Sequence, residues 1–269
     1  MNSETKELRN GAVTIIDGGK LRIHVYNTKD AIDDQVIVVE RPHKIRKGGK
    51  GVVIELPCFK NSIEEMTGYL KDSDIDVEGK LVAYHAAGDT FLPGVKAYMT
   101  ESAHKYNTVG GGKGLIDNFT GAFGDAFDST VTGDGERIGE GKLTIAGIDM
   151  VINPDNDAYE VEIPEMKAAY MHMLGHDCHS IVAGAGHADA IIANLQGYLD
   201  RGFELFLSAH YGPETRQDVE TKIAYLRDLK DIAAGCSSAE EFTARVNERY
   251  PGYSGANYLG MTAGFFFPQ

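Results

Sequence analysis

The order of apolar runs along the chain constrains its fold more than any single motif does. In the first half, short runs rich in β-branched residues alternate with turns, as at 12–16 (AVTII), 36–40 (VIVVE) and 51–56 (GVVIEL). Such runs predict strands, because β-branched side chains pack well on a pleated surface. Residues 61–72 interrupt them with apolar positions three or four apart, which predicts a helix.

The second half of the chain predicts further strands and then mostly helices. Helical spacing and capping residues recur over 187–202, 213–233 and 237–250, while FELFLS at 203–208 is typical of one buried strand. This order predicts an α/β protein with two sheets covered by helices, a four-layer αββα sandwich. We expect a single domain over 1–269, because no break in composition marks a boundary.

Charge and cysteine content limit the partners and the compartment. The 269 residues carry a formal net charge of −14, which repels phosphate backbones and anionic lipid, so we expect neither nucleic acid nor membrane as a partner. No apolar run approaches the roughly 20 residues of a membrane span, and no secretory leader is evident. Three widely spaced cysteines fit a reducing cytoplasm. The expected partner is a small-molecule substrate.

Polar residues follow two of the predicted strands. His85 and Asp89 lie in YHAAGDT after one strand, and His210 and Tyr211 follow FELFLS. Binding sites of α/β proteins gather at the carboxyl ends of strands, which makes His210 a candidate pocket residue. Simpler interpretations remain open: His85 as a histidine bonded to backbone, and Asp89 as a turn residue.

A second group of histidines occupies MHMLGHDCHS and comprises His172, His176 and His179. If 166–173 is a strand, His172 points to one face of it, whereas His176 and His179 lie in the following loop. Those two are candidates for a substitute acid/base or ligand set. The alternative is a polar loop whose histidines cap the next helix.

The whole pattern resembles the metallo-β-lactamase fold family over most of the chain. The resemblance rests on four stations: GVVIELP, LVAYHAAGDT, IPEMKAAYMHM and FLSAHYGPETRQDVE. In the family, the first station is a strand that ends near an acid, and the second is a strand followed by the motif HxHxDH. The third is a proline and an acid before a short strand, and the fourth is a strand that ends in a histidine. The segment beginning MLGHDCHS is similar to the alkylsulfatase-like branch.

The family's metal motif is incomplete here. The resemblance aligns His85 and Asp89 with family ligands, but Ala87 and Thr90 replace histidines. The station PDNDAY holds Asp155, Asn156 or Asp157 in place of a histidine, and His210 is kept. The resemblance thus implies a ligand set of His85, Asp89, Asp155 and His210 for at most one zinc, iron or manganese ion. The lost ligands argue against a dinuclear zinc site.

The resemblance implies a hydrolase with a reduced metal site. Its substrate would be a small ester, thioester, lactone or sulfate-like compound, and the candidate catalytic residues are His85, Asp89, His210, Tyr211, His176 and His179. A metal-free lyase or isomerase using the same pocket is one alternative, and a non-catalytic binding protein is another.

The chain ends in an apolar run, GFFF at 264–267. Exposed aromatic residues in a row are a liability in solution, so they predict a contact. Phe265 to Phe267 are candidates for a homodimer contact, and docking onto the same chain is the alternative.

Overall fold

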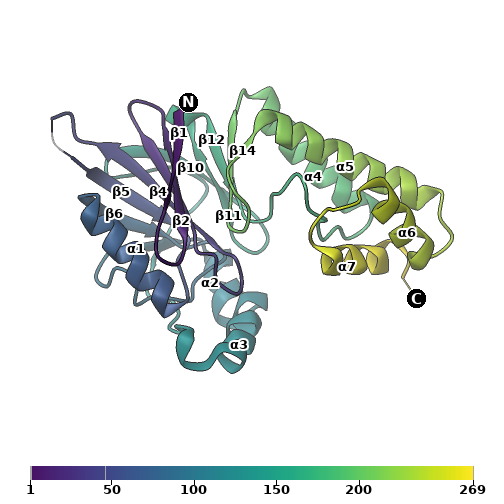
Figure 1. Ribbon diagram of the computed structural model, residues 1–269, viewed down its shortest axis with the longest axis horizontal. Coiled ribbons are helices and arrows are strands. Elements are labelled where there is room, and N and C mark those ends of the chain that lie inside the picture. Colours follow the sequence, from purple (N-terminus) through teal and green to yellow (C-terminus); the bar gives the residue numbers. More distant parts are fainter. Residues whose placement is uncertain (1, 46, 269) are drawn as a thin grey trace. The chain divides into compact units, whose positions relative to one another are not determined.

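The computed structural model of the chain describes residues 2–45 and 47–268. These residues form two compact units, shown in Figure 1. The first unit contains the chain up to His172 together with Leu207–Gly212, and the second contains Met173–Phe206 and the chain from Pro213 onward. The prediction of one domain is not tested by this division and stays a prediction.

The first unit is built on an eight-stranded sheet whose strands follow chain order. Its strands are β1 (Asn2–Glu7), β2 (Ala12–Asp17), β3 (Arg22–Asn27), β4 (Gln35–Pro42), β5 (Gly49–Ile54), β6 (Ile75–Leu81), β7 (Ala97–Met99) and β8 (Glu136–Arg137). Strands β1 to β5 form an antiparallel meander, and β5 to β8 are parallel. The change of direction follows from the crossover helix α1 (Lys60–Asp72), because parallel neighbours need a long connection.

A second, antiparallel sheet completes this unit. It contains β9 (Gly141–Ile145), β10 (Ile148–Pro154), β11 (Tyr159–Ile163) and β12 (Ala168–Met171), and the last residues of β13 (Leu205–Ser208) continue beside β12. The two sheets pack against each other through tyrosines. The Tyr159 hydroxyl donates to the Tyr98 carbonyl at 3.2 Å, and Tyr170, which is fully buried, donates to the Glu55 carboxylate.

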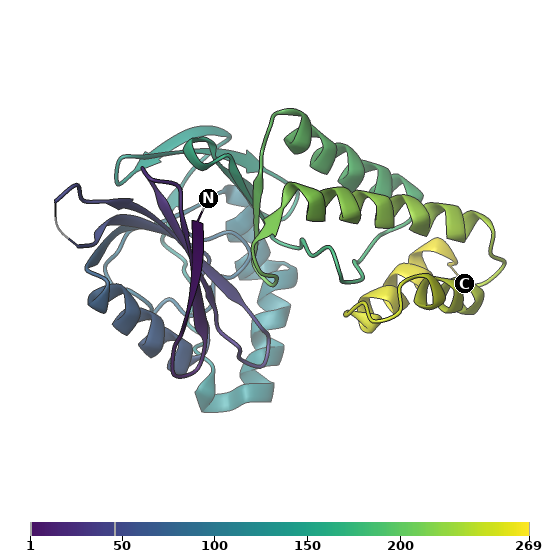
Figure 2. The same cartoon turned by 45° about the horizontal axis from the view of Figure 1, so that its top comes forward.

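Helices of the first unit lie on the outer face and at the end of the eight-stranded sheet. Both ribbon views show α1 along the face of β5 and β6, with α2 (Glu101–Val109) and α3 (Gly111–Phe123) beyond it (Figure 1, Figure 2). The face of α1 that carries Met66, Tyr69 and Leu70 is buried. This is the apolar stripe that the sequence predicted.

The second unit is mainly helical. It contains α4 (Ala185–Asp200), the start of β13 paired with β14 (Glu214–Thr215), α5 (Arg216–Ala234), α6 (Ala239–Arg249) and α7 (Ala256–Phe266). Helix α5, the long green helix of Figure 2, lies alongside α4. A capping box starts α5, since the Thr215 hydroxyl accepts from the Asp218 amide and the Asp218 carboxylate accepts from the Thr215 amide.

The structure differs locally from the sequence prediction for one strand and adds detail for the C-terminal aromatic run. The strand expected at 166–173 is shorter, Ala168–Met171, because Pro164–Met166 form a 3-10 turn closed by Lys167 in the left-handed region (φ 48°). In the C-terminal run, Phe266 stacks on Phe242 at 5.5 Å, which is a contact within the chain, while Phe265 stays about half exposed. The predicted dimer contact is untested. No helix of the described residues is both long and apolar enough to cross a membrane.

Candidate metal centre

Three histidines of the first unit converge on one point. His85 follows β6, His172 follows β12 and His210 follows β13. The Nε2 atom of His172 lies 3.2 Å from the Nε2 atom of His85 and 3.2 Å from that of His210. One ring nitrogen from each histidine falls within 4.8 Å of the others, and each ring is partly buried. We call these residues the three-histidine group.

A buried glutamate fixes the loop that carries His85. Glu55 directly follows β5 and has a left-handed backbone (φ 64°), and no part of it is exposed. Its carboxylate accepts from the backbone amides of Ala83, Tyr84 and His85 at 3.3, 2.9 and 2.8 Å. These amides would otherwise be unsatisfied inside the protein, so Glu55 fixes the backbone position from which the His85 side chain extends.

The other two histidines are tied to each other through backbone. The carbonyl of His172 accepts from the Ala209 amide at 3.2 Å and from the Ser208 hydroxyl at 2.9 Å. His210 therefore leaves β13 directly beside His172. Two neighbouring strands of one sheet thus supply two rings, and the opposite sheet supplies the third.

Asp34 lies behind the group. It precedes β4, only 2% of its side chain is exposed, and its Oδ1 atom lies 3.3 Å from His210 Nδ1 and 3.7 Å from His85 Nδ1. Neither Asp34 Oδ1 nor His85 Nδ1 has a hydrogen bond within standard geometry. The Cys58 thiol donates to Asp34 Oδ2 at 3.5 Å, and burial, together with the charge of Asp34, raises the pKa of this thiol.

These contacts set the chemistry of the ring nitrogens. A carboxylate 3.3 Å from His210 Nδ1 favours a proton on that nitrogen, which would leave the lone pair of its Nε2 directed at the group. Burial, and then the charges of His85 and His210, hold the pKa of His172 well below its ordinary value. Neutral imidazoles are the protonation state that binds metal.

The spacing of the three-histidine group suits a tetrahedral ion. Zinc–nitrogen bonds of about 2.0–2.1 Å at tetrahedral angles place the nitrogens about 3.3–3.4 Å apart. The observed 3.2 Å separations are close to that value. Among the residues that the structure describes, no fourth ligand joins the group. Three imidazoles match the number of protein ligands in a catalytic zinc site, whereas a structural zinc site has four.

An aromatic residue covers one side of the group. The ring of Tyr84 stacks on His172, with centroids 4.0 Å apart and planes 6° from parallel. Its hydroxyl donates to Asp155 Oδ2 at 2.7 Å. Burial and this contact with Asp155 raise the pKa of Tyr84, so its hydroxyl remains a donor. The other Asp155 oxygen accepts from the amides of Asp157 and Ala158, which closes a turn.

Asp89 has a different set of partners from the other predicted ligands. Its Oδ1 atom accepts from Lys80 Nζ at 3.0 Å and from the Thr132 hydroxyl at 2.7 Å. The Lys80 side chain is only 3% exposed, so Asp89 balances a buried charge. Within the described part of the chain, the three-histidine group contains neither Asp89 nor Asp155. The prediction that these two are ligands stays a prediction.

The remaining candidates occupy separate surroundings. Tyr211 follows His210 and is partly buried. In the second unit, His176 Nδ1 lies 2.7 Å from Glu214 Oε1, a contact that outweighs the desolvation and raises the pKa of His176. His179 is buried, with its Nδ1 atom 2.9 Å from the Tyr225 hydroxyl, and burial lowers its pKa. His176 and His179 thus have unlike partners and do not form one pair.

Sequence reasoning missed two members of this site. His172 was grouped with His176 and His179 rather than with the ligands, although its position at a strand end was a usable signal. Asp34 carried no signal, because it lies in an ordinary turn sequence, AIDDQ, ahead of a strand.

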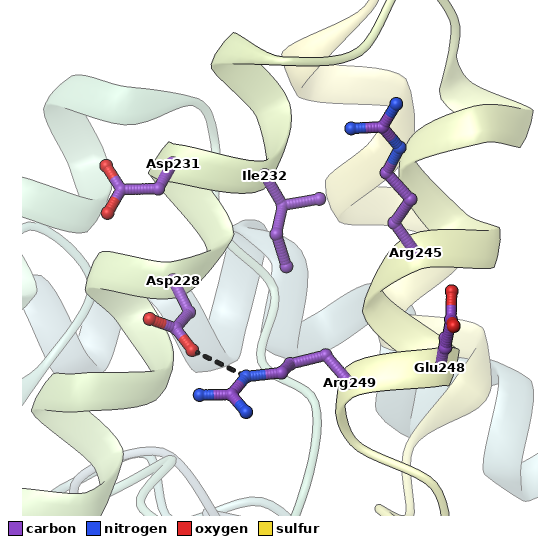
Figure 3. Close-up of a pocket in the computed structure, with 6 residues that line it drawn as sticks. All are labelled: Asp228, Asp231, Ile232, Arg245, Glu248 and Arg249. Carbon is purple, nitrogen blue, oxygen red and sulfur yellow. Dashed lines mark hydrogen bonds and ion pairs between the residues drawn. The ribbon is translucent and has the colours of Figure 1, made fainter.

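A cavity of about 570 Å³ lies elsewhere, between α5 and α6 of the second unit (Figure 3). Its side chains are mostly charged, and Arg249 Nε donates to Asp228 Oδ2 at 3.2 Å across it. Paired charges of this kind are typical of a solvated groove between helices. We assign it no function.

Comparison with solved structures identifies the fold. The chain is similar to a metallo-beta-lactamase family protein from Thermus thermophilus (13% identity, TM-score 0.60, 89% of this chain and 91% of that one). It is also similar to a beta-lactamase domain protein from Burkholderia ambifaria (13% identity, TM-score 0.62, 94% and 86%). The chain therefore has the metallo-β-lactamase fold, as the sequence motifs predicted.

A third similar structure is the stereoselective inverting sec-alkylsulfatase from Pseudomonas sp. (13% identity, TM-score 0.56). The match covers 98% of this chain but 50% of the alkylsulfatase, so this chain spans about half the length of that protein. No family model matches the sequence, and no curated protein does. At these identities the likeness establishes the fold alone.

Proposed function

We propose that the protein is a hydrolase that uses a single divalent metal ion, most suitably zinc, held by His85, His172 and His210. The observation that carries the proposal is that His172 Nε2 lies 3.2 Å from the Nε2 atoms of both His85 and His210, with Asp34 behind the rings. This set differs from the one implied by the family motif, since His172 replaces the aspartates as a ligand. The similar solved structures include a sec-alkylsulfatase, which supports a hydrolytic role.

A divalent ion bound there supplies Lewis acidity toward a carbonyl oxygen and toward water. Residues around the three-histidine group would position the ligands and shield them from water. Asp34 places a negative charge beside the Nδ1 atoms of His85 and His210, and Glu55 holds the backbone of the His85 loop. Tyr84 shields one face of His172 from water, and with Asp155 it provides a donor and an acceptor beside the group.

The substrate class follows from charge. The net charge of −14 slows the approach of anionic substrates. Asp155 and Asp157, both exposed, add negative charge next to Tyr84. We therefore propose a neutral carbonyl compound, an ester, thioester or lactone, in preference to a sulfate or phosphate ester.

Metal content of purified protein tests the site. We expect about one equivalent of zinc after reconstitution, and a loss of most of it in His172→Ala. His176→Ala is the matched control, because His176 is a histidine four residues away whose partner is Glu214. Equal metal content in the two variants would contradict the ligand set. A wild-type protein that binds no metal, yet hydrolyses an ester, would favour the metal-free alternative.

A second arm tests the substrate class. A neutral thioester and a sulfate ester with the same alkyl group are offered to the reconstituted protein. Faster hydrolysis of the thioester, abolished in His172→Ala, supports the proposal. Faster hydrolysis of the sulfate ester would refute the argument from charge.

A further inference from the structure

A cavity of about 700 Å³ lies on the outer face of the eight-stranded sheet, within the first unit. Its size is typical of small-molecule sites. Strands β1 to β4, the end of α1 and the loop before β5 form its walls. The lining residues used below are Glu4, Asp17, Arg22, His24, Glu40 and Tyr69.

This cavity is remote from the three-histidine group. Asp34 precedes β4, while Glu40 lies near the other end of that strand. Six residues of extended chain span about 20 Å. The cavity is therefore not part of the proposed metal centre.

Three buried polar side chains form a chain of contacts at the cavity. Tyr69 Oη lies 2.7 Å from His24 Nδ1, and His24 Nε2 lies 3.0 Å from Glu40 Oε2. All three residues are at least 95% buried. An ionised carboxylate only accepts, so an ionised Glu40 accepts from His24 Nε2; in that neutral tautomer of His24, Nδ1 accepts from the Tyr69 hydroxyl. Burial raises the pKa of Tyr69 to about 12, which keeps its hydroxyl a donor.

This arrangement leaves one oxygen without a partner. Glu40 Oε1 is buried and makes no hydrogen bond, although the residue is only 1% exposed. The nearest cation, Arg22, reaches only the other oxygen, with Nη1 at 3.9 Å from Oε2, and donates its Nε hydrogen to Asp17 at 2.9 Å. A buried carboxylate oxygen without a partner is costly, and a bound water, ion or ligand can supply the donor it lacks.

The charge of the lining indicates what kind of donor fits. Glu4, Asp17 and Glu40 contribute three negative charges, and Arg22 and Lys47 contribute two positive ones. Lys47 is directed elsewhere, since its ammonium donates to the Asp72 carbonyl. The remaining excess is negative, and the unpaired atom is an acceptor. Both properties favour a cation with N–H groups.

We propose that this cavity binds a small organic cation, a primary ammonium compound, whose N–H groups donate to Glu40 Oε1. His24 holds the carboxylate in place through Oε2, and Tyr69 in turn holds the His24 ring. The Arg22 guanidinium lies beside the Glu40 carboxylate, competes with the ligand for its negative charge and so lowers the affinity for the ammonium compound. This binding function is independent of the proposed hydrolase.

The test is calorimetric titration of the full chain with n-butylammonium chloride at constant ionic strength. We expect saturable binding in the millimolar range, weakened at least about tenfold by Glu40→Gln. This variant keeps the shape of the side chain and removes its charge. Asp117→Asn, an exposed carboxylate on α3, is the matched control for net charge and is expected to bind as the wild type does.

A second variant keeps the proposal falsifiable if Glu40→Gln fails to fold. Arg22→Gln removes the competing cation, so it should bind n-butylammonium severalfold more tightly. Equal or weaker binding by Arg22→Gln, undiminished binding by Glu40→Gln, or no binding to the wild type would each overturn the proposal. His210→Ala should bind the ammonium normally, which separates this result from any failure of the metal centre.

Discussion

Replacing Asp89 by asparagine should destabilise the protein without removing metal. The reason is that Lys80, with 3% of its side chain exposed, loses the anion that balances its charge. Breaking a buried ion pair by removing one partner costs about 3–5 kcal/mol. The Asp89 side chain is 37% exposed, so water partly screens the ion pair. Lys80 also keeps a 3.1 Å hydrogen bond to the Phe91 carbonyl, and both effects reduce the cost of losing the carboxylate charge. We therefore expect a loss of about 2–3 kcal/mol in the free energy of unfolding.

Urea denaturation followed by circular dichroism measures this loss. Lys80→Met combined with Asp89→Asn should recover part of it, because the double variant leaves no buried cation. Thr132→Val provides a control, since it removes the hydroxyl that donates to Asp89 and should cost only about 1 kcal/mol. If Asp89→Asn costs less than about 1 kcal/mol and at the same time lowers the zinc content, Asp89 is a ligand and our reasoning about Lys80 is wrong.

Two further predictions concern the carboxylate behind the metal centre and a buried histidine of the second unit. Asp34→Asn should weaken zinc affinity about 10–100-fold, measured by competition with a chromophoric chelator, because it removes the charge that orients His85 and His210; unchanged affinity would show that Asp34 does not position the rings. His179 has a lowered pKa in the folded state, from burial and then from the charge of Lys222. The unfolded chain therefore binds a proton first, so stability is full above pH ~6.5 and falls on acidification by at most about 1.4 kcal/mol per pH unit. Urea unfolding at several pH values checks this, and a His179→Gln variant with the same acid slope would rule it out.

The sequence allowed the fold to be predicted, and it singled out two of the three histidines that converge in the structure. Strand and helix periodicity located most elements, since burial on one face leaves a regular pattern. His85 and His210 were recognised because each ends a strand at a position that the resemblance marks. Their proximity in the structure agrees with that alignment, although their roles remain proposals.

What escaped prediction depends on side chains meeting across the fold. His172 directly follows an apolar stretch, AAYM, and its place at a strand end did not show whether its ring turns toward His85 or toward His176. Lys80 looked like an ordinary strand residue, so its contact with Asp89 could not be anticipated. Asp34 reaches the group from a turn about 50 residues before His85, a contact that no spacing rule contains.

The origin of the three histidines has a consequence for the motions of the first unit. His85 extends from one sheet, and His172 and His210 extend from the other, so an ion held between them would cross-link the two sheets at their edge. Removing it with a chelator should then speed amide hydrogen exchange first in the residues that follow β6 and β12, before exchange changes in the meander of β1 to β4. The bound ion would then hold the edges of the two sheets together, and the rate at which it dissociates would limit the rate of local opening at that edge.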